Sequence, residues 1–263
     1  MSRILIALAV SLAAATAATA AGADDPSESV SVLVPVVGSV SGANGVRWRT
    51  DVDLVNDMNH EITVALSLPT TAAPTILLTL PPHSTQRFAD VAAEAFGLET
   101  ALSPMQVQTL GKRSVRIAAS VYGVRGSEVF RPAAIAIDYG NSYMPLRALH
   151  GLSFTDAFRT NIGIVNLGEH PAAITLALQR LEGRNVAVQR MTLQPNTISH
   201  LAIQSLFPLI TKGDDFTVLV ESGSRDTYAF ASVIDNETNE AHFIQPAIAV
   251  TLQGHAMLAS SSP

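Results

Sequence analysis

The chain carries one nine-residue stretch twice: Trp48-Arg49-Thr50-Asp51-Val52-Asp53-Leu54-Val55-Asn56 returns 110 positions later as Phe158-Arg159-Thr160-Asn161-Ile162-Gly163-Ile164-Val165-Asn166. Side chains at alternate positions of a β-strand lie on the same face. In both copies one face keeps an aromatic start, a threonine, two aliphatic side chains and a final asparagine, whereas the other changes from Asp53 to Gly163. The better-kept face is therefore predicted to point into a core. Its predicted core residues are Trp48, Val52, Leu54, Phe158, Ile162 and Ile164.

Four further segments recur in the same order. They are Ile62-Thr63-Val64-Ala65-Leu66 and Ile174-Thr175-Leu176-Ala177-Leu178, Leu80-Pro81-Pro82 and Leu193-Gln194-Pro195, Ala119-Ser120-Val121 and Ala231-Ser232-Val233, and Pro132-Ala133-Ala134-Ile135-Ala136 and Pro246-Ala247-Ile248-Ala249. The offset grows only from 110 residues (48 to 158) to 114 residues (132 to 246), which indicates a duplicated domain. We expect a first module at 30–138, a linker at 139–145, a second module at 146–250 and a flexible tail at 251–263.

Each module is predicted to be a β-sandwich. Strands are expected at 30–37, 47–56, 61–68, 75–80, 104–110, 114–124 and 128–137, and at 146–152, 157–166, 171–180, 185–194, 215–222, 226–235 and 241–249. One short helix is expected in each module, from Phe88 to Phe96 before Gly97 and from Leu201 to Phe207 before Pro208. Seven short strands in about 110 residues, with turn signals between them, are typical of an immunoglobulin-like sandwich. The predicted fold class is all-β, with two such domains in tandem.

The first 21 residues have the pattern of a secretory signal peptide. Arg3 precedes an apolar run from Ile4 to Ala15, and Ala18-Thr19-Ala20 fits the cleavage pattern. No later run approaches the 18 apolar residues of a membrane helix. We therefore expect an exported, soluble protein, periplasmic or extracellular, with no membrane span after cleavage.

Composition excludes several classes of protein. Among 263 residues there is no cysteine, the net charge is -6 and charged residues make up only 14%. A chain without cysteine has no disulfide scaffold and no thiolate-ligated metal. A general nucleic-acid binder usually has a basic excess, so no nucleic-acid partner is expected.

No motif for catalysis, a cofactor or a metal stands out. The chain lacks H-E-x-x-H, G-x-S-x-G and phosphate-binding glycine loops. Asp51 and Asp53 are interpreted as solvated strand residues. The acidic turn around Asp235, Glu237 and Glu240 leaves a weak calcium site open. The prediction is therefore no catalytic residue, no cofactor and no metal ligand.

Two kinds of residue have a structural and a functional interpretation. Trp48, the single tryptophan, is predicted to be a core anchor whose replacement by alanine costs about 3–5 kcal/mol; the alternative is an exposed platform for sugar. Arg49 and Arg159 lie on the opposite strand face. They are predicted to form ion pairs, for example with Asp51, or, as possible interaction residues, to contact a partner.

The segments Val34-Pro35-Val36-Val37, Trp48-Arg49-Thr50-Asp51 and Val55-Asn56, with a glycine-rich loop before the second, resemble tandem β-sandwich modules of exported bacterial proteins of uncharacterised function. The second module departs from the pattern, with Leu146-Arg147-Ala148 at its start. The resemblance and the residues together predict a non-catalytic extracytoplasmic binding or structural protein. Its expected partner is a protein or polysaccharide of the cell envelope. The alternatives are a pair of carbohydrate-binding modules and, ranked lower, a hydrolytic enzyme.

Overall fold

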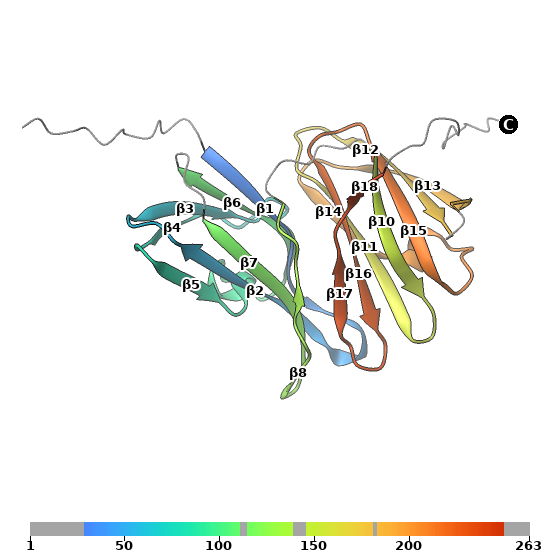
Figure 1. Cartoon of the computed structure of the whole chain (residues 1–263), viewed down its shortest axis with the longest axis horizontal. Coiled ribbons are helices and arrows are strands. Elements are labelled where there is room, and N and C mark those ends of the chain that lie inside the picture. Colours follow the sequence, from blue (N-terminus) through green and yellow to red (C-terminus); the bar gives the residue numbers. More distant parts are fainter. Residues whose placement is uncertain (1–28, 111–114, 139–145, 181–182, 250–263) are drawn as a thin grey trace, which may run out of the picture.

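The computed structural model describes residues 29–110, 115–138, 146–180 and 183–249 (Figure 1). The expected signal peptide, the linker 139–145 and the tail 251–263 lie outside the described residues. Within those ranges the protein is all-β, with two α-helices of four residues each. No helix in the described part of the chain has the length and apolar character needed to cross a bilayer.

The first module contains strands β1 to β9 in two layers. One layer has the strand order β4-β3-β6-β1. In the other layer β2 lies between β5 and β7, and β7 also pairs with the short strands β8 and β9. The end of β1 also pairs with β2, so that the layers are continuous along this strand. The strands are β1 (Ser29–Ser41), β2 (Arg47–Asn56), β3 (Ile62–Ser67), β4 (Ile76–Leu80), β5 (Ser84–Phe88), β6 (Ala101–Leu110), β7 (Arg116–Arg125), β8 (Glu128–Val129) and β9 (Ala133–Ala134).

The second module repeats these pairings in two sheets. Their orders are β13-β12-β15-β10-β18 and β14-β11-β16-β17. The pairs β10·β15, β12·β13, β11·β14 and β11·β16 match β1·β6, β3·β4, β2·β5 and β2·β7. The strands are β10 (Leu146–Phe154), β11 (Phe158–Asn166), β12 (Ala172–Gln179), β13 (Asn185–Leu193), β14 (Thr197–Ala202), β15 (Gly213–Ser222), β16 (Thr227–Asp235), β17 (Ala241–Ile244) and β18 (Ala247–Ile248). The sequence repeat is thus also a repeat of strand topology.

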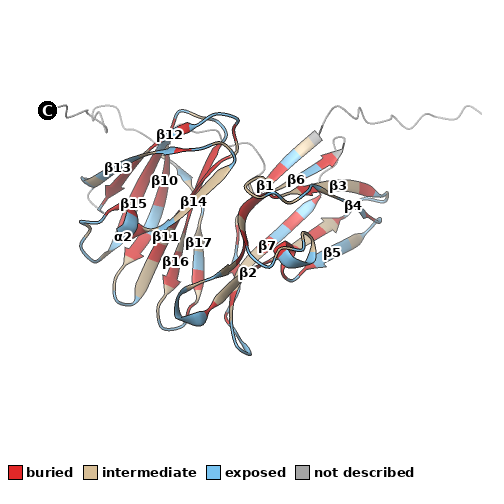
Figure 2. Cartoon of the chain, turned by 180° about the vertical axis from the view of Figure 1, so that it is seen from behind, coloured by how far each residue is buried: buried red, intermediate tan, exposed pale blue. Residues whose placement is uncertain are grey.

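Among the described residues each module has nine strands instead of the expected seven. One strand was missed at the same place in each copy, β5 and β14, immediately before the helix. β5 lies at the margin of its sheet and is mostly exposed (Figure 2), so its sequence Ser84-Thr85-Gln86-Arg87-Phe88 lacks the apolar alternation that indicates a strand. The other additional strand of each module comes from division of its final expected strand into two short ones.

Both helices are shorter than expected, and the missed strands take up the first residues of the expected helices, Phe88 in one and Leu201-Ala202 in the other. Helix α1 (Val91–Glu94) follows β5, and helix α2 (Ile203–Leu206) follows β14. Asp90 caps α1 by accepting a hydrogen bond from the Ala93 amide at 3.4 Å. Gly97 ends this segment at φ 66°, and its amide donates to the Ala93 carbonyl at 3.0 Å. This single backbone bond from a left-handed residue is the αL helix end, at which glycine is favoured.

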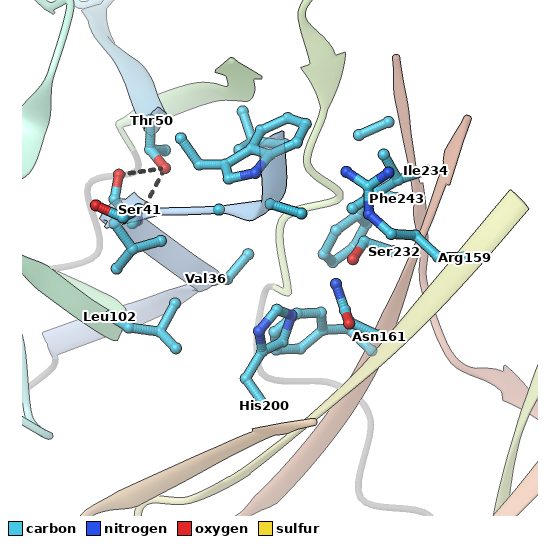
Figure 3. Close-up of a pocket in the computed structure, with 18 residues that line it drawn as sticks. Val36, Ser41, Thr50, Leu102, Arg159, Asn161, His200, Ser232, Ile234 and Phe243 are labelled. Carbon is cyan, nitrogen blue, oxygen red and sulfur yellow. Dashed lines mark hydrogen bonds between the residues drawn. The ribbon is translucent and has the colours of Figure 1, made fainter. Parts of the chain in front are cut away.

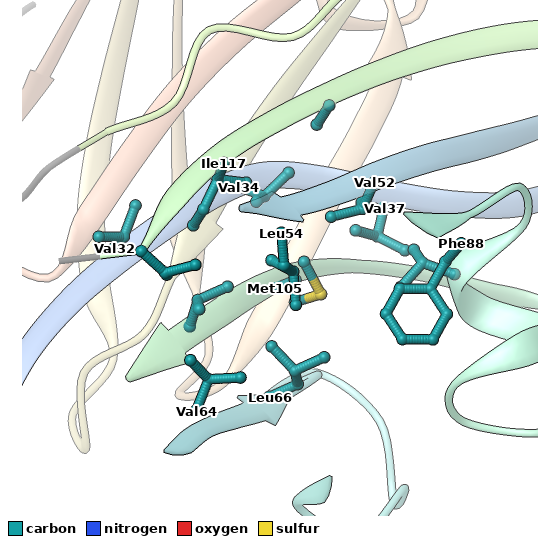
Figure 4. Close-up of a cluster of buried hydrophobic side chains, with 14 of the residues drawn as sticks. Val32, Val34, Val37, Val52, Leu54, Val64, Leu66, Phe88, Met105 and Ile117 are labelled. Carbon is teal, nitrogen blue, oxygen red and sulfur yellow. The ribbon is translucent and has the colours of Figure 1, made fainter. Parts of the chain in front are cut away.

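The core of each module lies between its two layers. In the first, Val32, Val64 and Met105 from one layer meet Leu54 and Ile117 from the other (Figure 4). The second module has an equivalent cluster around its own repeat strand β11. The aliphatic residues that the sequence places in the core, namely Val52, Leu54, Ile162 and Ile164, are each at most 1% exposed.

The two polar residues on the repeated face join separate parts of each module. Thr50 Oγ1 accepts a hydrogen bond from the Gly38 amide at 2.9 Å, and Thr160 Oγ1 accepts one from the Ser153 amide at 3.1 Å. Each threonine therefore ties the repeat strand to the strand before it. Because neither threonine is more than 1% exposed, these contacts satisfy polar groups that water does not reach.

The repeated asparagine binds two loops at once. Asn56 Nδ2 donates to the carbonyls of His60, Leu80 and Pro81 at 2.9, 3.0 and 2.9 Å. Asn166 Nδ2 donates to the equivalent carbonyls at 2.8, 3.1 and 3.2 Å, those of His170, Leu193 and Gln194. Each Oδ1 also accepts a backbone amide two residues ahead. The asparagine that ends the repeated nine-residue stretch is thus bonded, in both modules, to the recurring segment that begins at Leu80 or Leu193.

The outer face of the second module's β14-β11-β16-β17 sheet packs against β1 of the first module. Val165, Tyr228 and Phe230 are buried there together with Leu33 and Val36. Gly163 makes room for this layer, since a Cβ at that position would overlap the ring of Phe230. The change from Asp53 to Gly163 between the copies is therefore a change from an outer polar face to a packed one.

Candidate functional site

A cavity of about 300 Å³ lies at the junction of the two modules. Figure 3 shows Val36 and Leu102 of the first module on one side and Arg159, Asn161 and Ser232 of the second on the other. Both modules therefore contribute walls, and the cavity exists only when they are docked. Ligand sites in proteins occur preferentially at such domain interfaces.

Three stacked rings form one wall of the cavity. The rings of His200 and Phe230 have centroids 5.9 Å apart and an angle of 22° between their planes. Phe230 and Phe243 follow at 5.4 Å and 18°. The rings come from β14, β16 and β17, and the backbone of Gly163 on β11 lies opposite both His200 and Phe230 in register. An apolar, flat wall results.

Trp48 lies at this junction and not in the core of the first module. Its ring is half-buried and packs with Val121 and Ala133 of its own module and with Ile234 and Ala241 of the other. It also lines the cavity. The prediction that Trp48 is a core anchor is therefore corrected, because the inner face of β2 extends beyond the core at this end. Its counterpart Phe158 is also half-buried but packs against the core of the second module.

Replacing Trp48 with alanine should accordingly cost less than core burial would imply. We expect the free energy of unfolding to fall by about 2 kcal/mol, against about 3 kcal/mol or more for Phe158→Ala, which opens a hole beside a core. Chemical denaturation of both variants checks this. A larger loss for Trp48→Ala than for Phe158→Ala would contradict the assignment of the tryptophan to the junction.

Arg159 is the only charged side chain that lines the cavity among the described residues. It donates to Asn236 Oδ1 at 2.7 Å and Asn239 Oδ1 at 3.4 Å. Burial lowers the pKa of its guanidinium, opposed by the charge of Asp235. An arginine remains protonated in proteins nonetheless. Within the described ranges no carboxylate lies at ion-pair distance from it, so its direct hydrogen bonds are to neutral amides and the charge of Asp235 acts on it only from farther away.

Two other polar side chains face the cavity from the same sheet. Asn161 and Ser232 are cross-strand neighbours on β11 and β16. Neither side chain has a hydrogen bond to another described residue, although both line the cavity. Together with Arg159 they place donors on the second module's side of a cavity whose lining is mostly aliphatic and aromatic.

Asp51, the predicted ion-pair partner of the repeated arginines, pairs with another arginine in the structure. Asp51 pairs with Arg87, whose Nη2 is 2.9 Å from its Oδ2, and Arg49 Nε lies 3.5 Å from Asp90 Oδ2. Asp53 also lies 3.9 Å from Arg87, so that the two aspartates share a cation across β2 and β5. Burial is the main cause that raises the pKa of Asp51, although the Arg87 hydrogen bond opposes it. Arg49 thus lies on the outer face of the first module, apart from the cavity.

The acidic turn at Asp235 uses its carboxylate for the backbone. Asp235 Oδ1 accepts hydrogen bonds from the amides of Glu237 and Thr238, both at 2.8 Å. These bonds lower the pKa of Asp235. Among the described residues no three metal-ligating side chains of the His, Cys, Asp and Glu type lie together.

His200 gives the stability of the junction a dependence on pH. Burial lowers the pKa of His200 below its ordinary value, so below about pH 6.5 the unfolded chain binds this proton more readily than the folded chain. The stability that the neutral ring contributes is present above that pH and is lost as the pH falls. The free energy of unfolding should therefore fall between about pH 7.5 and pH 5, and it should fall further for the parent protein than for the His200→Phe variant. The difference between the two falls is at most about 1.4 kcal/mol per pH unit.

Denaturation midpoints across this range measure the difference. His170→Phe is the matched control, because this histidine lies exposed on a turn, and it should follow the parent protein. Parallel pH profiles for the parent and His200→Phe would contradict the role of the buried ring.

Neither a family model nor a curated protein matches this chain. The site must therefore be argued from its own residues. Trp48 and Arg159 stand out in the sequence, and the structure brings both to one cavity. His200, Phe230 and Phe243 were not predicted from the sequence as site residues. A signal for Phe230 exists in the repeat itself: it stands where the first module has Ala118, on the face where Gly163 replaces Asp53.

Proposed function

We propose that this chain is an exported, non-catalytic binding protein whose two modules are tandem immunoglobulin-like β-sandwiches and whose ligand site is the junction cavity. The repeated topology of two packed layers supports the fold assignment. The pattern of the first 21 residues supports export, to the periplasm or beyond the cell. The absence of a recognisable catalytic motif in the sequence supports a binding function over a hydrolytic one.

One observation carries the proposal: donors without protein partners face an aromatic cavity that the two modules build jointly. Asn161 and Ser232 lack hydrogen bonds to the described residues, and Arg159 is held only by neutral amides. The side chains of Asn161 and Ser232 are half-exposed, so water reaches them and their hydrogen-bonding groups are free for a ligand. A ligand that fills the cavity would replace this water as their partner and would also stabilise the docking of the modules.

The test is native mass spectrometry of the chain isolated without denaturation from the compartment to which it is exported. We expect a mass increment of a small molecule on the processed chain. Asn161→Phe, which fills the cavity, should remove it. The matched control Asn59→Phe lies on an exposed turn and should keep it. An identical increment in both variants, or the bare mass in every preparation, would overturn the proposal.

The predicted envelope partner has its own experiment. We propose that a protein or polysaccharide of the cell envelope meets the chain at an outer surface, and crosslinking in the host followed by purification identifies it. A stoichiometric protein supports the interaction. Copurified glycan favours the alternative of a carbohydrate-binding module pair, for which the ring of Trp48 beside the cavity is the supporting feature.

A further inference from the structure

We infer, on the premise that the junction cavity is a ligand site, that it takes a small aromatic carboxylate, with the ring between Trp48 and the stacked rings and the carboxylate at Arg159. This deepens the proposed function by assigning a ligand class. The two halves of such a ligand match two different walls of the cavity, one aromatic and one polar.

The apolar part of the cavity suits a flat ring. His200, Phe230 and Phe243 form a continuous stack, and the plane of each ring lies within 22° of parallel to that of its neighbour. Trp48 and Val36 of the first module also line the cavity. A ring bound here is in reach of offset or edge-on contacts with aromatic side chains, which add to the area buried.

The polar part suits an anion. A guanidinium has five N–H donors, and the described residues accept from only two of the nitrogens of Arg159. Its anchors Asn236 and Asn239 are neutral, so they fix the side chain without forming an ion pair with it, and the one carboxylate whose charge acts on it, that of Asp235, lies beyond ion-pair distance. Arginine binds carboxylates through paired N–H donors. Asn161 and Ser232 stand on the same sheet and add a further amide and a hydroxyl donor.

The size of the cavity and the charge of its lining restrict the class of ligand that it can take. A cavity of about 300 Å³ is at the small end of ligand sites, which fits one or two fused rings with a short acidic arm. A cationic ligand is disfavoured because Arg159 supplies the charge of the site. A sugar would need hydrogen-bond partners on all sides, whereas most lining side chains here are aliphatic or aromatic.

The experiment is isothermal titration of the processed chain with phenylacetate and indole-3-acetate. The neutral probe phenylacetamide keeps the ring and removes the charge, and propionate keeps the charge and removes the ring. We expect each aromatic acid to bind at least about tenfold more tightly than either control probe. Arg159→Gln should weaken phenylacetate at least about tenfold and phenylacetamide less than about threefold.

Three further variants keep the result independent of folding. Asn161→Phe should abolish binding of both acids, and Asn59→Phe should leave it unchanged. Ser232→Ala removes one donor without disturbing Arg159 and should weaken phenylacetate by about threefold to tenfold. An unfolding midpoint is recorded for each variant, and a binding loss counts only where the midpoint is kept.

The outcomes separate this inference from the function on which it rests. Equal binding of phenylacetate and phenylacetamide overturns the anion site. Binding of propionate or of a neutral sugar in place of the aromatic acids overturns the ring site. In both cases the cavity remains a ligand site. If neither aromatic acid binds while the isolated chain carries a mass increment that Asn161→Phe removes, the ligand class is wrong and the function stands. If nothing binds and no increment exists, both fail.

Discussion

Replacing Asn166 with alanine is expected to lower the free energy of unfolding of the second module by about 3–4 kcal/mol. The side chain is fully buried and makes four hydrogen bonds, three to carbonyls and one from the Gly168 amide. Alanine removes all four and leaves buried backbone groups without partners, which costs about 1–3 kcal/mol for each group that water does not reach. Chemical denaturation followed by circular dichroism measures the loss.

Matched variants distinguish this role from a general effect of changing the strand. Asn161→Ala changes the same residue type on the same strand, but its side chain has no hydrogen bond to a described residue and should cost about 0.5 kcal/mol or less. Asn166→Asp keeps the acceptor for Gly168 but sets a carboxylate oxygen against the three carbonyls, so it should cost at least as much as alanine. Asn56→Ala should reproduce the loss in the first module. Similar small effects for Asn161→Ala and Asn166→Ala would contradict the argument.

The repeat made most of the architecture predictable. Strict alternation along Trp48–Asn56 separates an inner from an outer face, and the buried positions of Val52 and Leu54 follow from it. The sequence also shows that Asn56 and Leu80-Pro81 recur, although not that they bond to each other, because their contact joins residues more than twenty positions apart. Long-range pairing of this kind leaves no local pattern.

The candidate site was predictable only in part, for a physical reason. Arg159 and Trp48 drew attention as repeated or unique residues, yet they meet only because one module docks on the other. The modules dock through the outer face of a sheet. Alternation along a strand shows which residues share that face, but it does not show whether the face meets water or another module. The contrast between copies, with Asp53 and Ala118 in one and Gly163 and Phe230 in the other, was the available sign.

Strands β5 and β14 were not predicted, for a different physical reason. Both are short and half-exposed, and they carry polar residues such as Gln86 and His200 where a core strand would have aliphatic ones. Their existence follows from backbone pairing with β2 and β11, which any residue except proline can supply. His200 therefore entered the cavity from a strand that the sequence did not indicate.

Replacing Gly163 with valine is the second change with a large expected effect. A Cβ at this position would overlap the ring of Phe230, which is 1% exposed and stacked on both sides, so the ring cannot move without breaking the junction. We expect a loss of about 3 kcal/mol, at the upper end for overpacking. Denaturation measures this loss, and the emission of the single tryptophan at the cavity should change with it.

A double-mutant cycle identifies the cause of that loss. Phe230→Ala removes the ring that the new side chain would strike, so Gly163→Val should cost much less in that background than in the parent, with a coupling of about 1–3 kcal/mol. Gly223→Ala is the matched control, since a Cβ there meets no atom within 4 Å, and it should be near neutral. Additive costs for Gly163→Val and Phe230→Ala would instead mean that the glycine serves the backbone of β11. The docked face, and the cavity beside it, would then not depend on the absence of a side chain at this position.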